Sequence, residues 1–155
     1  MRMLAPVLLA MMLALGAVAC GGSDAQQRNA YAAAVNRAQT GFASRFRTLS
    51  ARISGTTSAS EGRRALQGFQ HAVDGVLVRL QSIHPPVGLR ALHRRLIGQM
   101  REYGREIAKA KAAYRTRTPA TILDAQNSLV RATTAISSRI NRTVAAINRQ
   151  LRRTP

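Results

Sequence analysis

The stretch IHPPVGLRALHRRL, residues 83–96, contains the end of one predicted helix and the start of another. A residue that precedes proline is pushed away from helical backbone angles, so His84-Pro85-Pro86 should end the first helix. Proline is tolerated in the first turn of a helix, so the same pair can begin the next one. Leucine then recurs at positions 89, 92 and 96, which is the spacing of one helix face. The stretch therefore predicts a turn between two helices.

The same apolar spacing occurs in four segments of the chain, and none of them alternates as a β-strand would. The four apolar runs are Tyr31 to Ile53, Leu66 to Ile83, Leu89 to Tyr114, and Ile122 to Leu151. Polar stretches separate them, including SGTTSAS at 54–60 and RTRTPA at 115–120. Short connections favour antiparallel neighbours. We therefore predict an all-α fold, an antiparallel (up-down-up-down) four-helix bundle over residues 28–153.

Two of the predicted helix starts carry N-terminal signals. Ser58 and Glu61 match a capping box, in which the serine oxygen accepts from a backbone N–H and the glutamate reaches back. Thr118 fits an N-cap with Pro119 as the first helical residue.

The stretch ALGAVACGGSD, residues 14–24, holds the only cysteine of the chain. It follows a basic start at Arg2 and a run without charges at 3–19, a combination typical of a secretory signal. A single cysteine cannot form an internal disulfide, and an unpaired thiol is unusual in an exported protein unless it is modified. Residues 1–19 are therefore predicted to be a signal peptide.

Ala17-Val18-Ala19-Cys20 resembles the lipobox of bacterial lipoproteins. The resemblance implies that a diacylglyceryl group is added to the sulfur of Cys20 and that a peptidase cuts before this residue. It further implies a flexible tether at 20–27 and an anchor on the outer face of the bacterial cytoplasmic membrane. Ala17 departs from the family pattern, in which leucine is the most frequent residue at that position.

The stretches YAAAVNRAQTGFASRF, residues 31–46, and IHPPVGLRALHRRL also resemble small helical lipoproteins of high-GC Gram-positive bacteria. That resemblance implies a location and carries no activity with it. Only Cys20 transfers from it as a functional residue.

Two other interpretations of the N-terminal stretch remain open. Ala17-x-Ala19 also satisfies an ordinary signal peptidase site, which would release a secreted protein with a free thiol on Cys20. The charge-free run of about 17 residues is at the lower limit for spanning a bilayer, so an uncleaved anchor helix is the third interpretation. The lipoprotein interpretation is preferred because only it gives the cysteine a function.

The chain carries 24 basic and 6 acidic residues, a formal net charge of +18. Such a charge favours anionic partners, among them anionic lipid, an anionic wall polymer or nucleic acid. The export signal and the scarcity of stacking aromatics disfavour nucleic acid. All basic residues except Lys109 and Lys111 are arginines, so the composition also fits the coding bias of a GC-rich genome.

Three arginines close the last predicted helix: Arg149, Arg152 and Arg153. In an up-down-up-down bundle this helix returns to the end at which the first helix begins, so we predict that these arginines contact anionic headgroups. Their alternative role is to stabilise the negative end of the helix dipole. The opposite end is expected to be basic as well, through Arg52, Arg63, Arg64, Arg115 and Arg117.

No catalytic or metal-binding motif is recognisable. The three histidines, His71, His84 and His93, lack the spacing of a helical zinc site and are expected on the surface or in connections. Glu102 and Glu106 are expected to form ordinary surface pairs with the basic residues three positions later, Arg105 and Lys109. A nucleophile elbow and a phosphate loop are both missing from the sequence. We predict no enzymatic activity, no cofactor and no metal.

The sequence thus predicts a non-enzymatic, membrane-anchored extracytoplasmic lipoprotein that serves as an interaction or envelope-structural module with an unknown protein partner. The alternative is a ligand-binding helical module with a pocket for an anionic or lipidic molecule. Gln126 and Thr133, which are polar positions on an apolar stripe, are the candidates for lining such a pocket, although ordinary polar core residues explain them as well.

Overall fold

The computed structural model describes residues 23–53, 59–115 and 118–153. These residues form four long α-helices and a short 3₁₀ turn, and no β-strand occurs among them. The elements are α1 (Ser23–Ile53), α2 (Ala59–Gln81), η1 (Val87–Leu89), α3 (Arg90–Ala113) and α4 (Pro119–Arg153). The predicted all-α, four-helix fold is confirmed. The predicted signal peptide and Cys20 lie outside the described residues.

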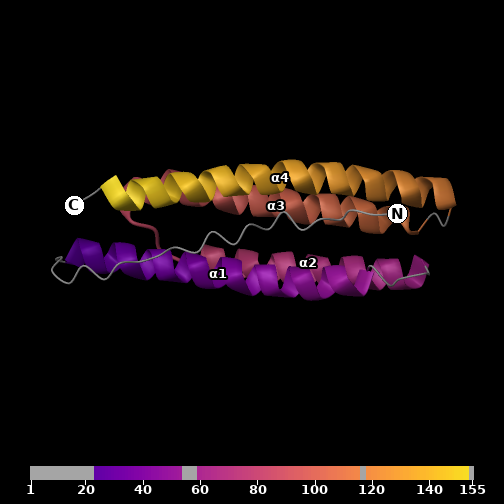
Figure 1. Ribbon diagram of the computed structural model, residues 1–155, viewed down its shortest axis with the longest axis horizontal. Helices are drawn as coiled ribbons and strands as arrows, with labels where there is room; N and C mark the ends of the chain where they lie inside the picture. Colours follow the sequence, from indigo (N-terminus) through magenta and orange to yellow (C-terminus); the bar gives the residue numbers. More distant parts are fainter. Residues whose placement is uncertain (1–22, 54–58, 116–117, 154–155) are drawn as a thin grey trace.

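Figure 1 shows the helices as two layers, α1 beside α2 and α3 beside α4, with consecutive helices running in opposite directions. Contacts at the two ends of the molecule agree with this arrangement. At one end the hydroxyl of Tyr31 in α1 lies 3.2 Å from Nδ1 of His93 in α3. At the other end Gln126 of α4 donates to the hydroxyl of Tyr114, just after α3, at 2.6 Å. We call the end at which α1 and α3 begin the near end, and the opposite end the far end.

The core consists of the apolar residues whose spacing predicted the helices. Six large side chains are fully buried: Val73, Leu80, Leu96, Ile107, Ile136 and Ile147. Helix α1 adds Tyr31, Val35 and Ala38. Burial of one branched aliphatic side chain contributes about 1.5–3 kcal/mol. Every buried residue of the described part of the chain lies between Tyr31 and Asn148, so these four helices contain their own core.

The two prolines separate α2 from α3 as the sequence predicted, but they do not begin α3. Pro86 has φ −53° and ψ 154°, an extended conformation that cannot continue a helix. The N–H of Leu89 then donates to the carbonyl of Pro86 at 2.9 Å, which closes η1. This turn occupies the positions after the prolines, so α3 begins only at Arg90.

The other helix starts differ from the sequence predictions in detail. Helix α1 begins at Ser23, so residues 23–27 are helical although they were expected in the flexible tether. An acidic residue in the first turn, Asp24, favours this early start because the N-terminal end of a helix is positive. Helix α4 begins at Pro119 as predicted, and the hydroxyl of Thr118 lies 2.5 Å from that of Thr121. Ser58 of the predicted capping box lies outside the described residues.

Candidate functional site

Three segments of the chain meet at the near end of the bundle: the start of α1, the η1 turn and the end of α4 (Figure 1). A Cβ atom built on Gly88 of η1 would lie 3.6 Å from Nε2 of Gln150 in α4. Helix α1 starts here at Ser23, three residues after Cys20 in the sequence. Within the described structure, the near end therefore contains the residues that are nearest in sequence to Cys20, the predicted lipid-attachment residue.

The three predicted membrane-contact arginines lie at the C-terminal end of α4, at this near end. Arg149, Arg152 and Arg153 are exposed, and their spacing of three and four residues brings them to one side of the helix. Within the described residues, no hydrogen bond or ion pair engages their side chains. Positive charge is favourable at the C-terminal end of a helix, so their position also fits the dipole role.

The near end carries an exposed apolar residue that the helical pattern did not single out. Val87 of η1 is 76% exposed, the highest value among the large hydrophobic side chains of the described residues. It follows the extended Pro86, whereas Leu89, two residues later, is buried. In the sequence, Val87 stood outside the stripe formed by residues 89, 92 and 96, which was the available signal that it would not join the core.

His93 is buried at the near end, so the expectation that all three histidines lie on the surface or in connections is wrong for this residue. Its Nε2 lies 2.9 Å from the carbonyl oxygen of Leu80, which can only accept, so Nε2 carries the proton. Nδ1 then accepts from the hydroxyl of Tyr31 at 3.2 Å. Burial lowers the pKa of His93 below its usual 6.5, and the hydrogen bond to Leu80 opposes this in part. His71 and His84 are exposed, as expected.

The neutral ring of His93 connects three helices, because its partners lie on α1 and α2 while it belongs to α3. The rings of His93 and Tyr31 also meet edge to face, with their centroids 5.7 Å apart. Burial raises the pKa of the Tyr31 hydroxyl to about 12, so this group remains a donor at neutral pH. The buried contacts of His93 with Tyr31 and Leu80 therefore hold α1, α2 and α3 together at the near end.

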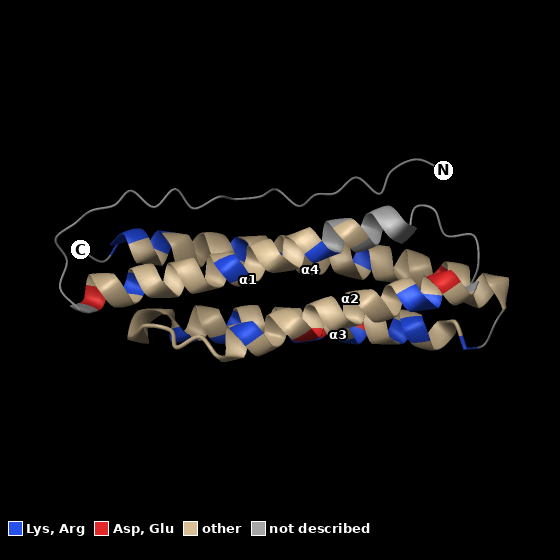
Figure 2. Cartoon of the chain, turned by 90° about the horizontal axis from the view of Figure 1, so that it is seen from below, with Lys and Arg blue, Asp and Glu red and all other residues tan. Residues whose placement is uncertain are grey.

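Basic residues are spread over all four helices rather than gathered at one end, as Figure 2 shows. At the far end Arg63, Arg64 and Arg115 are exposed, together with the acidic residues Glu61 and Asp124. The side chain of Arg52 and the whole of Arg117 lie outside the described part of the chain. Charge alone therefore does not distinguish the two ends of the bundle.

One of the two predicted carboxylate pairs is correct and the other is wrong. Glu106 accepts from Lys109 at 2.7 Å, as the three-residue spacing predicted. Glu102 instead pairs with Arg139 of α4, with Oε1 and Nη2 2.5 Å apart, because this side of α3 faces α4. Among the described residues, no group of three or more His, Cys, Asp or Glu side chains could hold a metal ion.

The two polar positions considered for a ligand pocket make local hydrogen bonds. Gln126 is exposed and donates to the hydroxyl of Tyr114. Thr133 donates to the carbonyl of Val130, within its own helix, at 3.1 Å. Surface hollows occur elsewhere, along the line where α1 packs on α2.

Within residues 23–53, 59–115 and 118–153, no helix is apolar over a length sufficient to cross a bilayer. No protein-family model, curated protein or solved structure matches the chain. The function of this protein is therefore inferred from its own residues.

Proposed function

We propose that this protein is a non-enzymatic helical module on the outer face of the bacterial cytoplasmic membrane, held there by a diacylglyceryl group on Cys20. In this proposal the bundle serves interaction or envelope structure, and its near end faces the lipid headgroups. The observation that carries the proposal is the start of α1 at Ser23, which leaves only Gly21 and Gly22 between the lipid-bearing residue and the bundle.

The short linker limits how far the near end can lie from the membrane. Three residues of chain, from Cys20 to Ser23, span at most about 11 Å even when fully extended. The headgroup layer is itself about 5–8 Å thick on each side of a bilayer. Electrostatic attraction extends about 8 Å at physiological ionic strength. A lipid on Cys20 would thus hold the near end within reach of the headgroup charge.

The exposed arginines of α4 complement this position. Arg149, Arg152 and Arg153 have no carboxylate partner within the described residues, so anionic headgroups can engage them without breaking an existing pair. Each basic residue near an anionic surface contributes about 1 kcal/mol. A lipid anchor combined with a basic patch is the kind of dual signal that gives stable membrane attachment.

Cell fractionation tests the anchor. We expect the wild-type protein in the membrane fraction of a bacterium that processes lipoproteins, and we expect Cys20→Ser to lose the lipid and leave that fraction or remain unprocessed. A Cys20→Ser chain that has lost residues 1–19 and still divides between membrane and medium as the wild-type protein does would contradict the proposal, because the thiol would then have no role in attachment.

Vesicle binding tests the orientation separately from the anchor. The probe is the chain 20–155 with Cys20→Ser, which lacks the lipid, mixed with vesicles that contain or lack anionic lipid. Because three contacts of about 1 kcal/mol are removed, Arg149→Gln, Arg152→Gln and Arg153→Gln together should weaken binding to anionic vesicles by about 100-fold. The matched control replaces three far-end residues, Arg63, Arg64 and Arg115, and so removes the same charge. Equal losses in the two triple variants would contradict the proposed orientation.

A further inference from the structure

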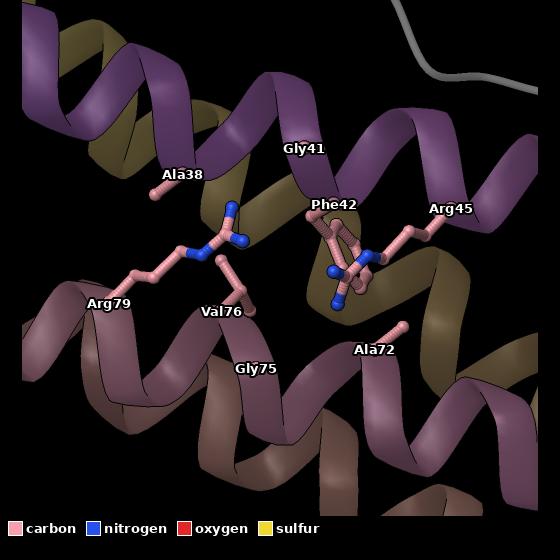
Figure 3. Close-up of a pocket in the computed structure, with 8 residues that line it drawn as sticks. All are labelled: Ala38, Gly41, Phe42, Arg45, Ala72, Gly75, Val76 and Arg79. Carbon is pink, nitrogen blue, oxygen red and sulfur yellow. The ribbon is translucent and has the colours of Figure 1, made fainter.

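Two arginines from different helices point into one hollow between α1 and α2 (Figure 3). Four residues of each helix line it: Ala38, Gly41, Phe42 and Arg45 from α1, and Ala72, Gly75, Val76 and Arg79 from α2. The two charged members are both basic, and the lining includes no acidic residue. Asp74, next to Gly75 in sequence, is exposed and accepts instead from Gln70 at 3.1 Å.

The two guanidinium groups are arranged reciprocally. A Cβ atom built on Gly41 would lie 2.9 Å from Nη1 of Arg79, and one built on Gly75 would lie 3.2 Å from Nη1 of Arg45. Each arginine of one helix thus lies against a glycine of the other helix. Gly41 and Arg45 are four residues apart, as are Gly75 and Arg79, and four residues of helix rise about 6 Å. Because α1 and α2 run antiparallel, the two side chains point toward each other along the line where the helices pack (Figure 3).

The arrangement of the two guanidinium groups favours a bound anion over an unoccupied hollow. Two guanidinium groups with no carboxylate in the same hollow repel each other, and an anion between them converts that repulsion into two attractions. Guanidinium groups match phosphate oxygens with paired, charge-assisted hydrogen bonds. The apolar floor, formed by Ala38, Phe42 and Val76, strengthens these bonds because it excludes water from one side.

The hollow opens to solvent and its inner space is about 10 Å³, roughly that of one water molecule. A space of this size admits about one oxygen atom of an anionic group and leaves the rest of the ligand on the surface. A second, more open hollow of about 350 Å³ adjoins it and shares Ala38 and Arg79 with it. This second hollow adds Arg37 and extends past Ser82 toward the near end. The two hollows together form a groove that carries three arginines.

We propose that the Arg45–Arg79 pair binds one phosphate group of a linear, phosphate-containing polyanion, and that the polyanion continues along the groove past Arg37. Glycine at positions 41 and 75 leaves room for the guanidinium groups beside the opposite helix. The site is independent of the lipid on Cys20, so it can be tested on the unlipidated chain.

The test measures binding of short-chain linear polyphosphate by titration calorimetry at physiological salt, with the chain 20–155 carrying Cys20→Ser. Arg45→Gln with Arg79→Gln should weaken binding by at least about tenfold, since each charge-assisted hydrogen bond is worth a factor of this size. The control, Arg63→Gln with Arg64→Gln, removes the same charge from a part of α2 outside the hollow and should change binding by less than about threefold. Equal weakening in the two double variants would overturn the proposal, because it would show attraction to net charge alone.

A second pair of variants tests the geometry without changing any charge. Gly41→Ala places a methyl group 2.9 Å from Nη1 of Arg79, so the guanidinium group must move away from its present position, whereas a Cβ atom on Gly98 meets nothing within 4 Å. We expect Gly41→Ala to weaken polyphosphate binding severalfold and Gly98→Ala to leave it unchanged. Wild-type affinity in Gly41→Ala would overturn the assignment of the site to this hollow.

Comparison with inorganic orthophosphate tests whether the ligand is a chain. Arg37→Gln should weaken the binding of polyphosphate and leave that of orthophosphate unchanged, because only a chain reaches Arg37 from the Arg45–Arg79 pair. Loss of both in Arg37→Gln, or equal affinity of the wild-type protein for orthophosphate and polyphosphate, would overturn the extension along the groove.

Discussion

The hydroxyl of Tyr31 donates a hydrogen bond of 3.2 Å to Nδ1 of His93, and this bond ties the first turns of α1 to the first turns of α3. The two residues are 62 positions apart in the sequence. On its other side the imidazole donates to the carbonyl of Leu80 at the end of α2. One buried ring therefore sets the relative positions of three helices at the near end, where the linker to Cys20 begins.

The protein should lose stability as the pH falls below about 6.5, because the buried His93 must take up a proton that has no carboxylate partner. The pKa of His93 is lowered from 6.5 in the folded state by burial, so the unfolded chain binds a proton at higher pH than the native state does. The stabilisation is complete above 6.5 and is lost as the pH falls through the lower, folded-state pKa. Thermal unfolding between pH 4 and pH 8 measures this effect.

Two variants isolate the contribution of His93 to that pH dependence. His93→Gln should have a lower melting temperature at neutral pH and a flatter dependence on pH below 6.5. His71→Gln, at an exposed histidine, should keep the wild-type profile. A wild-type pH profile in His93→Gln would show that another group is responsible.

Tyr31→Phe should lower the free energy of unfolding by about 1–3 kcal/mol, because it leaves the buried Nδ1 of His93 without a donor. The matched control is Tyr114→Phe, which removes a hydroxyl whose partner Gln126 is exposed and can bond to water. Its cost should be smaller, about 0.5–1 kcal/mol. Denaturant titration measures both, and a larger loss in Tyr114→Phe would contradict the role assigned to the Tyr31–His93 bond.

Truncation in the core should cost far more than truncation on the surface of the same helix. Ile136→Ala, at a side chain that is 1% exposed, should destabilise the protein by about 2–5 kcal/mol. Leu123→Ala, at a side chain that is 57% exposed, should change stability by less than about 1 kcal/mol. Chemical denaturation distinguishes these outcomes, and similar costs would contradict the packing of α4 against α3.

The helices themselves were predictable from the sequence because apolar spacing and prolines are local signals. As those signals predicted, Leu89 and Leu96 are buried in the core and Pro119 begins α4. The burial of His93 was not predictable, because a polar residue on an apolar stripe becomes a core residue only when distant partners satisfy both of its nitrogens. Tyr31 and Leu80 do so through the packing of three helices.

The charged contacts illustrate the same limit. The Glu106–Lys109 pair follows from spacing along one helix, whereas the Glu102–Arg139 pair depends on how α3 and α4 pack. The reciprocal positions of Arg45 and Arg79 require the register between α1 and α2, which no single-helix pattern contains. The attachment of a lipid to Cys20 remains a prediction from the sequence.

Val87 should contribute to attachment if the near end meets the bilayer. Val87→Asp replaces a 76% exposed apolar side chain with a charge and should weaken binding of the unlipidated chain to anionic vesicles by at least about tenfold, through lost burial and added repulsion. Leu123→Asp is the control, because it makes the same change at an exposed apolar residue of the far end. Flotation with vesicles measures both, and a greater loss in Leu123→Asp would indicate that the far end meets the membrane.

The mass of the mature N-terminal peptide, measured by mass spectrometry on protein isolated from a lipoprotein-processing bacterium, tests the anchor most directly. The proposal predicts that the mature chain begins at Cys20 and that this residue carries a diacylglyceryl group. A mature chain that begins with an unmodified Cys20 and is found in the medium would contradict it, as would a chain that retains residues 1–19.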